Sequence, residues 1–192
     1  MGAQFVLASR SPRRRELLNQ MGLRYRVVEA DITESAYSGE SPADCVYRIA
    51  AKKARRVFEN GFSALPVLAA DTIVVLEGKI LGKPGTSACA SAMLQSLSGR
   101  THEVLTSVVL LSSGGVESRK LSVSRVTFAP IDPDWIAAYC NTSEPLDKAG
   151  AYAIQGYAAQ WIKRLEGSYS GVMGLPLYET AQLLRQAGVA VP

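Results

Sequence analysis

Residues 66–76 read PVLAADTIVVL, an almost wholly apolar segment with a single charge at Asp71. Nearly continuous aliphatic and β-branched residues are typical of a strand that is buried on both faces. A carboxylate inside such a strand is costly unless it is paired or hydrogen-bonded. Asp71 is therefore a structural aspartate at a strand break, a metal ligand, or a general base whose pKa is adjusted by its surroundings.

Strand and helix patterns alternate on both sides of this segment. A hydroxyl residue followed by proline predicts the start of a helix at Ser11-Pro12 and again at Ser41-Pro42. Turns are expected at Glu77-Gly78 and, within a long hairpin, at Gly114-Gly115. The predicted strands comprise residues 4–9, 23–32, 66–71, 72–81, 103–112, 116–128 and 160–167, and the predicted helices begin near residues 12, 42, 87, 133 and 176. The fold class is therefore α/β, with a mixed sheet flanked by helices.

The length and charge of the chain limit its organisation and its partners. Of the 192 residues, 47% are hydrophobic, which suffices for one substantial core but not for several ordinary domains. A single domain over residues 1–192 is expected. The net charge of +4 is modest, but six arginines lie within the first 26 residues. Such a cluster favours a local anionic partner, and composition leaves both a small phosphate ligand and a nucleic acid open.

The cysteines and the hydropathy pattern indicate the compartment. Cys45, Cys89 and Cys140 are far apart in sequence and form no CxxC or Cys/His cluster of the kind that binds zinc. The short apolar segment at residues 5–8 precedes its arginines, which is the reverse of a signal peptide, and no apolar run reaches membrane-spanning length. We therefore expect a soluble, cytoplasmic protein without membrane contact.

Arg13 and Arg14 fall in the first turn of the helix that is predicted after Ser11. The unpaired N–H groups and the positive end of the helix dipole favour an anion there and disfavour a cation. Two arginines in this turn are explained if a phosphate binds to them, because a guanidinium binds phosphate through paired hydrogen bonds. The alternative is a solvated basic face.

Lys53 lies on the apolar side of the helix that is predicted after Pro42. It is aligned at helical spacing with Val46, Ala50 and Val57. A buried ammonium without a counter-charge is strongly unfavourable. Lys53 therefore either extends outward along its own stem to water or contacts an anion.

Three further polar residues are candidates for a phosphate or nucleotide site. Glu34, in the acidic segment 31–40, would supply a second carboxylate, and together with Asp71 it would suit a divalent cation that bridges phosphates. Lys83 follows a glycine at a strand end, where it would reach a phosphate, although GKILGKP is not a phosphate loop. Gln155 offers a donor and an acceptor to a base edge. For each of the three the alternative is an ordinary loop or turn residue, and taken alone Glu34 and Gln155 are better explained in that way.

The sequence does not predict a serine-hydrolase triad. The segment GSYSG (167–171) has its serine misplaced for a nucleophile elbow, and His102 is the only histidine. Without a nucleophile motif, His102 is expected to be a strand-end residue that makes a hydrogen bond.

Taken together, these stretches resemble the Maf family of nucleotide pyrophosphatases over nearly the whole chain. Six segments occur in the family's order, which makes the resemblance specific, whereas any one of them alone would be weak. The segments are LASRSPRRRELL (7–18), ESPADCVYRIAAKKA (40–54), AADTIVVLEGKILGKP (69–84), LSGRTHEV (97–104), EPLDKAGAYAIQG (144–156) and GSYSGVMGLPLYET (167–180).

The resemblance implies a fold like that of the inosine triphosphate pyrophosphatases, with two lobes around a central cleft. It also implies hydrolysis between the α- and β-phosphates of a nucleotide with a divalent metal cation, Mg²⁺, Mn²⁺ or similar. Asp71 would be the catalytic carboxylate that activates water or holds the metal, and Lys53 would be the second catalytic residue. Glu34 would lie near the metal. The residues that would gather the triphosphate are Ser9, Arg13, Arg14, Lys53 and Lys83.

Three positions resemble the subgroup of this family that acts on dTTP and UTP, namely Arg13 in SPRR, Thr72 in ADT and Gln155 in IQG. The subgroup associated with 7-methyl-GTP tends to have an aromatic residue, Gln and Glu at these places. A glutamine meets a pyrimidine edge as donor and acceptor, whereas a glutamate favours the donor-rich edge of a methylated guanine. The expected substrate is therefore a pyrimidine nucleoside triphosphate.

Two alternatives remain open from the sequence. One is a pyrophosphatase for 7-methyl-GTP. The other is a regulatory binding module linked to septum formation, with which the family name is associated, or to nucleic acid, and only the basic N-terminal segment supports it. A small-molecule nucleoside triphosphate is the expected partner, nucleic acid is not, and a homodimer is compatible with this expectation.

Overall fold

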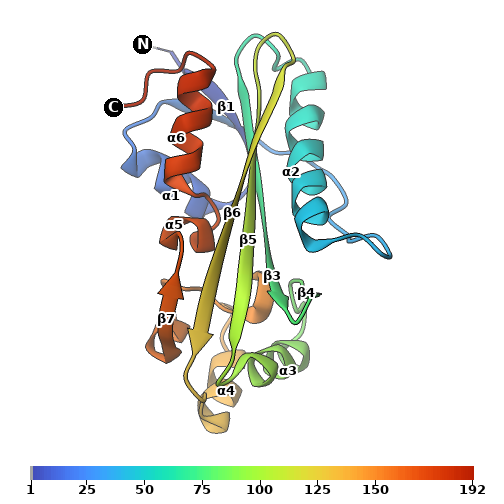
Figure 1. Ribbon diagram of the computed structural model, residues 1–192, viewed down its shortest axis with the longest axis vertical. Coiled ribbons are helices and arrows are strands. Elements are labelled where there is room, and N and C mark those ends of the chain that lie inside the picture. The colour runs from blue at the N-terminus through green and yellow to red at the C-terminus, as the bar shows by residue number, and fades with distance from the viewer. Residues whose placement is uncertain (1) are drawn as a thin grey trace. The chain divides into compact units, whose positions relative to one another are not determined.

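The apolar segment that contains Asp71 forms one strand of a mixed sheet. The computed structural model describes residues 2–192, and within them the sheet has seven strands. Their order is β2–β1–β3–β5–β6–β7, with β4 paired to β3 (Figure 1). Strand β1 pairs in parallel with β2 and β3, whereas β3–β4 and β6–β7 are antiparallel. The predicted α/β class with a mixed sheet flanked by helices is confirmed.

The elements follow the predicted order closely. The strands are β1 (Phe5–Ala8), β2 (Tyr25–Val28), β3 (Val67–Leu76), β4 (Lys79–Leu81), β5 (Thr101–Leu111), β6 (Glu117–Phe128) and β7 (Ile162–Glu166). The α-helices are α1 (Pro12–Gln20), α2 (Pro42–Glu59), α3 (Ser87–Leu97), α4 (Pro133–Cys140), α5 (Tyr169–Met173) and α6 (Leu177–Gln186). Two short 3₁₀ helices, η1 (Ala149–Ala151) and η2 (Tyr157–Trp161), complete the described elements. None of the helices in residues 2–192 has the length and apolar composition that crossing a bilayer requires.

The predicted helix starts and turns are confirmed by their local geometry. Ser11 and Ser41 cap α1 and α2, and in each case the serine side chain accepts a hydrogen bond from the backbone N–H three residues later. The β3–β4 turn uses Glu77 and Gly78, whose φ values of +49° and +77° match the twist of a two-residue hairpin.

Two details differ from the sequence prediction. Residues 67–76 form one continuous strand rather than two runs, so Asp71 does not lie at a strand break. Helix α5 has no counterpart among the predicted helices, since its five residues carry no helical hydrophobic period.

The chain divides into two compact units, as the resemblance implied for two lobes. The first unit contains the residues through Asp71, Thr106–Ser122 and Gly174–Pro192. The second contains Thr72–Leu105 and Val123–Met173. Strands β3, β5 and β6 contribute residues to both units.

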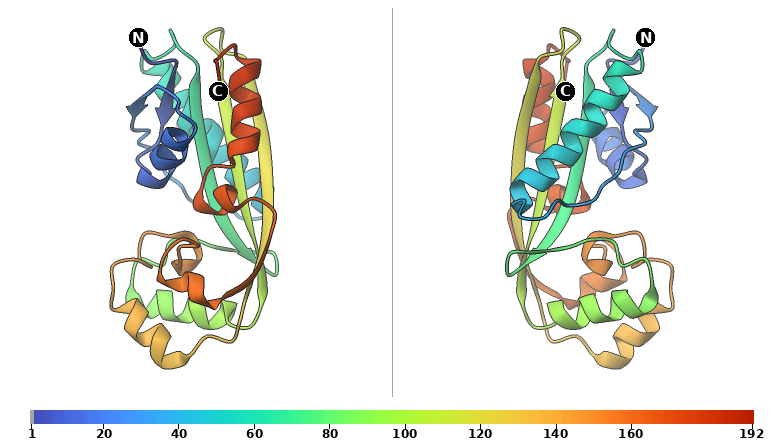
Figure 2. Two further views of the ribbon diagram at one scale, coloured as in Figure 1. Left: turned by 90° about the vertical axis from the view of Figure 1, so that its left-hand side faces the viewer. Right: turned by 90° about the vertical axis from the view of Figure 1, so that its right-hand side faces the viewer.

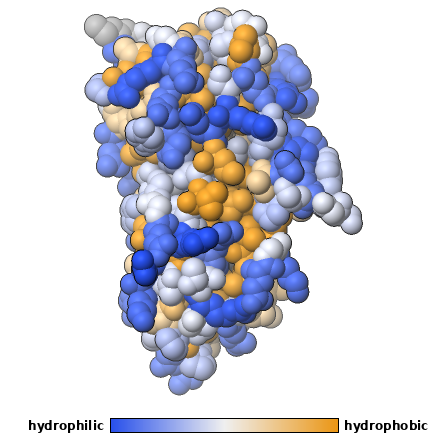
Figure 3. Space-filling model, in the orientation of Figure 1, coloured by the Kyte–Doolittle hydropathy of each residue, from blue (hydrophilic) through white to orange (hydrophobic). Residues whose placement is uncertain are grey.

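In the first unit, helices cover both faces of the sheet. Helix α2 lies on one face and α1 and α6 lie on the other (Figures 1 and 2). The apolar side of α2 packs on alternate residues of β1, β3 and β5, because side chains of a strand alternate between its two faces. The outer side of α2 is mostly hydrophilic (Figure 3). The buried residues of this cluster are Val6, Ala8, Ala30, Ala50, Ala51, Ala54, Val57, Val67, Ala69, Val109 and Leu111.

In the second unit, His102 is the centre of a buried aromatic group. Helix α3 packs against α4 and η1 in this unit. The His102 ring, 2% exposed, contacts Phe128 and Tyr152, and its Nε2 atom lies 2.7 Å from the Tyr152 hydroxyl. This confirms the expected hydrogen-bonded strand-end residue. Burial lowers the pKa of His102 to about 4, so the folded chain holds a neutral imidazole at pH 7.

We expect the chain to lose stability on acidification through His102. An unfolded histidine has a pKa of about 6.5, so between pH 6.5 and 4 the unfolded chain binds a proton that the folded chain does not. The stabilising contribution is complete above pH 6.5 and falls by about 1.4 kcal/mol per pH unit, up to about 3 kcal/mol near pH 4. Urea unfolding at pH 7, 6 and 5 measures it.

The control for this prediction is His102→Gln, which lacks the ionisable ring. The difference in unfolding free energy between this variant and the parent chain removes the contribution of the carboxylates, which both chains share. The unfolding free energy of the parent chain minus that of His102→Gln should decrease as the pH falls, because only the parent chain loses stability through His102. Parallel pH curves for the two chains would contradict the prediction.

Candidate active site

Asp71 and Lys53 are brought together by two periodicities. The two-residue period of β3 places Asp71 on the same face as Val67 and Ala69, which is the face that α2 covers. The helical period of α2 turns Lys53 to the same interface as Ala50 and Val57. The Lys53 Nζ atom donates to Asp71 Oδ1 at 2.7 Å, and both residues are buried. Lys53 therefore contacts an anion, which decides between the two alternatives that the sequence left open.

The Lys53 ammonium also binds the second predicted carboxylate. Its Nζ atom lies 2.6 Å from Glu34 Oε1. The Glu34 side chain is 39% exposed, against 8% for Lys53, so the cluster opens to solvent on the side of Glu34. One ammonium therefore bridges a buried carboxylate and a solvent-accessible carboxylate.

Arg14 supplies a buried guanidinium to the same unit. Its Nε atom donates to the carbonyl oxygen of Gly174 at 2.7 Å, and its Nη1 atom donates to Ser9 Oγ at 3.3 Å. Ser9 Oγ also accepts a hydrogen bond from the Ser11 N–H at 3.1 Å. Arg14 is 8% exposed and Ser9 5%, and these hydrogen bonds hold both side chains in place.

The charges around Arg14 connect it electrostatically with the two carboxylates. Burial lowers the pKa of the Arg14 guanidinium, and the nearby positive charge of Arg13 adds to this shift. The negative charges of Asp71 and Glu34 oppose it. Because a guanidinium stays protonated at neutral pH, Arg14 remains a permanent cation near the carboxylates.

The first unit brings together most of the predicted site residues. Those in contact or in electrostatic reach of one another are Ser9, Arg14, Glu34, Lys53 and Asp71. The half-buried Arg13 lies in the same helical turn as Arg14.

The other three predicted residues belong to the second unit. Thr72 follows Asp71 in β3 and is half-buried, whereas Lys83 and Gln155 are exposed. Gly82, next to Lys83, accepts a hydrogen bond from the Gly150 N–H at 3.2 Å. The turn that carries Lys83 therefore lies beside the start of the segment that leads to Gln155.

The segment around Gln155 is fixed by a carboxylate that the sequence did not single out. Glu144 Oε1 accepts hydrogen bonds from the Tyr139 hydroxyl at 2.8 Å and from the Tyr157 N–H at 3.2 Å. A Cβ atom on Gly156 would lie 2.1 Å from this oxygen. A side chain at position 156 would therefore displace the Glu144 carboxylate, whose hydrogen bond with the Tyr157 N–H holds the backbone two residues after Gln155.

The two carboxylates of the first unit fit a hard divalent cation. Mg²⁺ is commonly bound through one or two carboxylates together with water and substrate phosphates. Glu34 and Asp71 both pair with Lys53 Nζ, so their carboxylates lie close together, and a cation would bind them next to the ammonium or replace it. Across residues 2–192 there is no group of three or more His, Cys, Asp or Glu side chains that could hold a metal. The donor set therefore fits a cation whose remaining ligands are water or phosphate oxygens.

Sequence reasoning missed Glu144 and the residues that hold the segment containing Glu34, chiefly Arg48 and Glu40. The sequence offered only a weak signal for them. Arg48 lies four residues before Lys52 on the polar side of α2, where charged residues are usually solvated.

The fold and this cluster define a class of protein, namely an α/β protein whose charged site suits a phosphorylated ligand with a hard cation. Residues 4–187 match the family profile described as Maf-like protein. The chain belongs to this family, as its sequence motifs indicated.

Curated relatives match almost the full chain. A dTTP/UTP pyrophosphatase of Methylobacillus flagellatus is 55% identical over 98% of this chain and 95% of the relative. A dTTP/UTP pyrophosphatase of Cupriavidus pinatubonensis is 53% identical over 94% of this chain and 95% of the relative. Among solved structures, the chain is similar to a nucleoside-triphosphatase (dITP/XTP pyrophosphatase) of Mycobacterium abscessus, with 18% identity, a TM-score of 0.45 and coverage of 66% of this chain and 75% of that one.

Proposed function

We propose that this protein is a nucleoside triphosphate pyrophosphatase that hydrolyses dTTP and UTP to the monophosphate and pyrophosphate. The observation that carries the proposal is the cluster in which Lys53 bridges Asp71 and Glu34 beside the buried Arg14. The names of the relatives, at 53–55% identity over nearly the full chain, support the reaction and the substrates.

The residues of the first unit have complementary roles in this proposal. Asp71 accepts the proton of the attacking water or holds the metal, and one water is consumed for each α–β phosphoanhydride bond that breaks. Arg13 and Arg14 bind phosphate oxygens, since guanidinium groups match phosphate through paired hydrogen bonds. Ser9 Oγ accepts from Arg14 and fixes the direction of its guanidinium. Lys53 places a positive charge where negative charge develops during the reaction.

A divalent cation is part of the proposal. Glu34 and Asp71 would hold it, and its chemistry would be to neutralise charge on the phosphates and to lower the pKa of a bound water. Lys83 would bind the phosphate chain, while Thr72 and Gln155 would select the base. Gln155 suits this role because its backbone is held through Glu144 and its side chain is exposed.

The remaining expectations follow from the same set of residues. The proposed partner is a small-molecule nucleoside triphosphate, nucleic acid is not expected, and a homodimer is compatible with this site. We also propose a cytoplasmic location, because Cys45, Cys89 and Cys140 are all free thiols, as is usual in a reducing compartment.

A substrate panel tests the proposed function. Purified protein is incubated with dTTP, UTP, CTP, ATP and 7-methyl-GTP in the presence of Mg²⁺ or Mn²⁺, and the products are separated by ion-exchange chromatography. We expect kcat/KM to be highest for dTTP and UTP, with monophosphate and pyrophosphate formed in equal amounts. Release of orthophosphate from the triphosphate would overturn the proposal.

The panel also separates the alternatives. Preferential turnover of 7-methyl-GTP would assign the chain to that activity instead. Absence of turnover combined with nucleic acid binding that weakens steeply with salt would favour the regulatory binding module.

A further inference from the structure

The segment that carries Glu34 has little structure of its own. Residues 29–41 join β2 to α2 without helix or strand, and Glu34 and most of its neighbours are exposed. Within the segment, the Glu40 N–H donates to the Tyr37 carbonyl oxygen at 3.2 Å and closes a single turn. An exposed segment of this kind samples many conformations unless side chains hold it. Nevertheless Glu34 lies 2.6 Å from the Lys53 ammonium.

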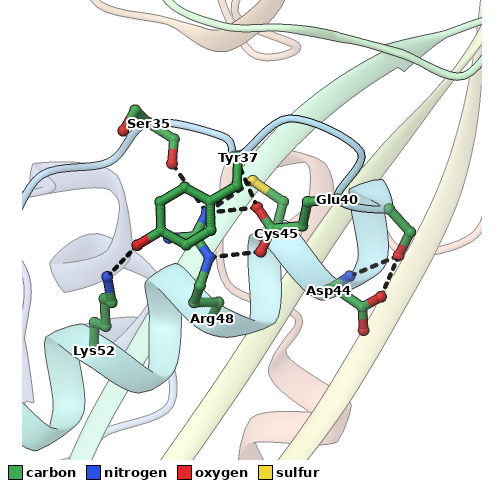
Figure 4. Close-up of polar contacts among 8 residues, drawn as sticks. Ser35, Tyr37, Glu40, Asp44, Cys45, Arg48 and Lys52 are labelled. Carbon is green, nitrogen blue, oxygen red and sulfur yellow. Dashed lines mark hydrogen bonds and ion pairs between the residues drawn. The ribbon is translucent and has the colours of Figure 1, made fainter.

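Arg48 of α2 binds this segment at three points (Figure 4). Its Nε and Nη2 atoms donate to Glu40 Oε1 and Oε2 at 2.5 and 2.6 Å, a paired geometry that a lysine cannot form. The Nη2 atom also donates to the Ser35 carbonyl oxygen at 2.9 Å, one residue after Glu34. The guanidinium lies over the ring of Tyr37, 3.8 Å from its centroid.

Two further contacts close the group. The Lys52 Nζ atom donates to the Tyr37 hydroxyl at 2.8 Å, and the Tyr37 N–H donates to Glu40 Oε2 at 3.1 Å. We name Arg48, Glu40, Tyr37 and Lys52 the loop clamp. Lys52 and Lys53 are adjacent on α2. The exposed Lys52 binds Tyr37 of the segment, and the buried Lys53 binds Glu34 of the same segment.

The loop clamp differs from an ordinary surface ion pair, which contributes little because water and side-chain entropy oppose it. The side chains of Arg48 and Glu40 are only 17% and 11% exposed. Hydrogen bonds from Arg48 lower the pKa of Glu40 to about 2, so the carboxylate is ionised throughout the neutral range.

We propose that Arg48 is a positioning residue that fixes Ser35, Tyr37 and Glu40 on α2 and thereby holds the Glu34 carboxylate at the cation site beside Asp71. The part of this inference that concerns the cation rests on the proposed function. In this proposal Arg48 touches neither the substrate nor the metal. Its effect passes through the position of Glu34.

The test compares Arg48→Met with Arg55→Met. Arg55 is a matched control, because it lies on the same helix and likewise donates to one glutamate, but that glutamate is Glu117 of β6 rather than a residue of the segment 29–41. Hydrogen–deuterium exchange of metal-free, nucleotide-free protein is followed for the amides of residues 33–40. We expect faster exchange in Arg48→Met and no change in this segment in Arg55→Met.

The second readout is Mn²⁺ affinity, measured by titration of the free-ion EPR signal without nucleotide. Loss of a side chain that orients a metal ligand typically weakens affinity by about 10- to 100-fold, and we expect Arg48→Met to fall in this range. In a Glu34→Gln background, Arg48→Met should have no further effect, because residues that act through one another are not additive.

Several outcomes would overturn the inference. Unchanged exchange in Arg48→Met would show that the segment does not depend on the loop clamp, and faster exchange with unchanged Mn²⁺ affinity would show that Glu34 does not depend on it. An additive effect in the Glu34→Gln background would assign Arg48 a separate role. If Arg48→Met fails to fold, Glu40→Gln removes the charge of the other partner of this ion pair, and the same two measurements decide the question. Exchange and Mn²⁺ binding need no turnover, so failure of the substrate panel remains a separate result.

Discussion

Replacing Asp71 with asparagine is expected to lower the rate of dTTP and UTP hydrolysis by about 10²–10⁴-fold, the range that a positioned proton acceptor contributes. Asparagine has nearly the same shape as aspartate, but it neither accepts the proton of water nor offers an anionic oxygen to a cation. Lys53 keeps Glu34 as its counter-charge, so the variant should remain folded. Steady-state kinetics at saturating metal and circular dichroism measure the two effects.

The matched control is Asp134→Asn on α4, an exposed aspartate of the second unit. It should retain the parent rate. Equal activity in Asp71→Asn and the parent chain would exclude Asp71 from the chemistry and leave it as a structural carboxylate that pairs with Lys53. A collapse of the thermal transition in Asp71→Asn would likewise point to a mainly structural role.

Replacing Lys53 with alanine is expected to lower kcat by about 10²–10³-fold, the effect of removing one preorganised group that stabilises developing charge. KM should change less, because Arg13 and Arg14 remain to bind the phosphates. The ammonium lies between the carboxylates of Asp71 and Glu34, and without it both are left to a cation. The half-saturating concentration of Mn²⁺ should therefore not rise.

This split between kcat and metal affinity distinguishes Lys53 from Arg48, whose loss is expected to weaken the cation site. Arg56→Ala serves as the control, since Arg56 is an exposed cation of the same helix. If Lys53→Ala raised KM alone and left kcat unchanged, Lys53 would be a binding residue rather than a catalytic one.

Much of the candidate site could be predicted from the sequence because its members violate local patterns. Asp71 interrupts an apolar strand and Lys53 interrupts the apolar side of a helix. Each period fixes a direction, since alternation along β3 and the helical repeat of α2 both turn the charged side chain toward the covered face of the sheet. The family motifs then provided one shared explanation for these residues.

The contacts of loop residues could not be predicted in this way. Glu34, Tyr37 and Glu40 lie in a segment without a period, so the sequence and its family resemblance suggested a role for Glu34 but gave no partner for Tyr37 or Glu40. Which of its carboxylates meets Lys53 and which meets Arg48 depends on a path that the side chains of α2 fix. Glu144 and Gly156 are a similar case, since the close approach between them joins positions that are separated along the chain.

The sequence by itself determined the α/β class, the helix starts at Ser11 and Ser41, the family, and the candidate charges Asp71, Lys53 and Arg14. The class, the helix starts and the charges follow from local periodicity and capping, which act over a few residues, and the family follows from the order of six motifs along the chain. Only the tertiary structure decided that Lys53 is shared by Asp71 and Glu34, and that Arg48 holds the segment between β2 and α2. The physical reason is that an ion pair depends on the distance between two side chains in space. In a loop without regular structure, the sequence spacing of residues does not determine that distance.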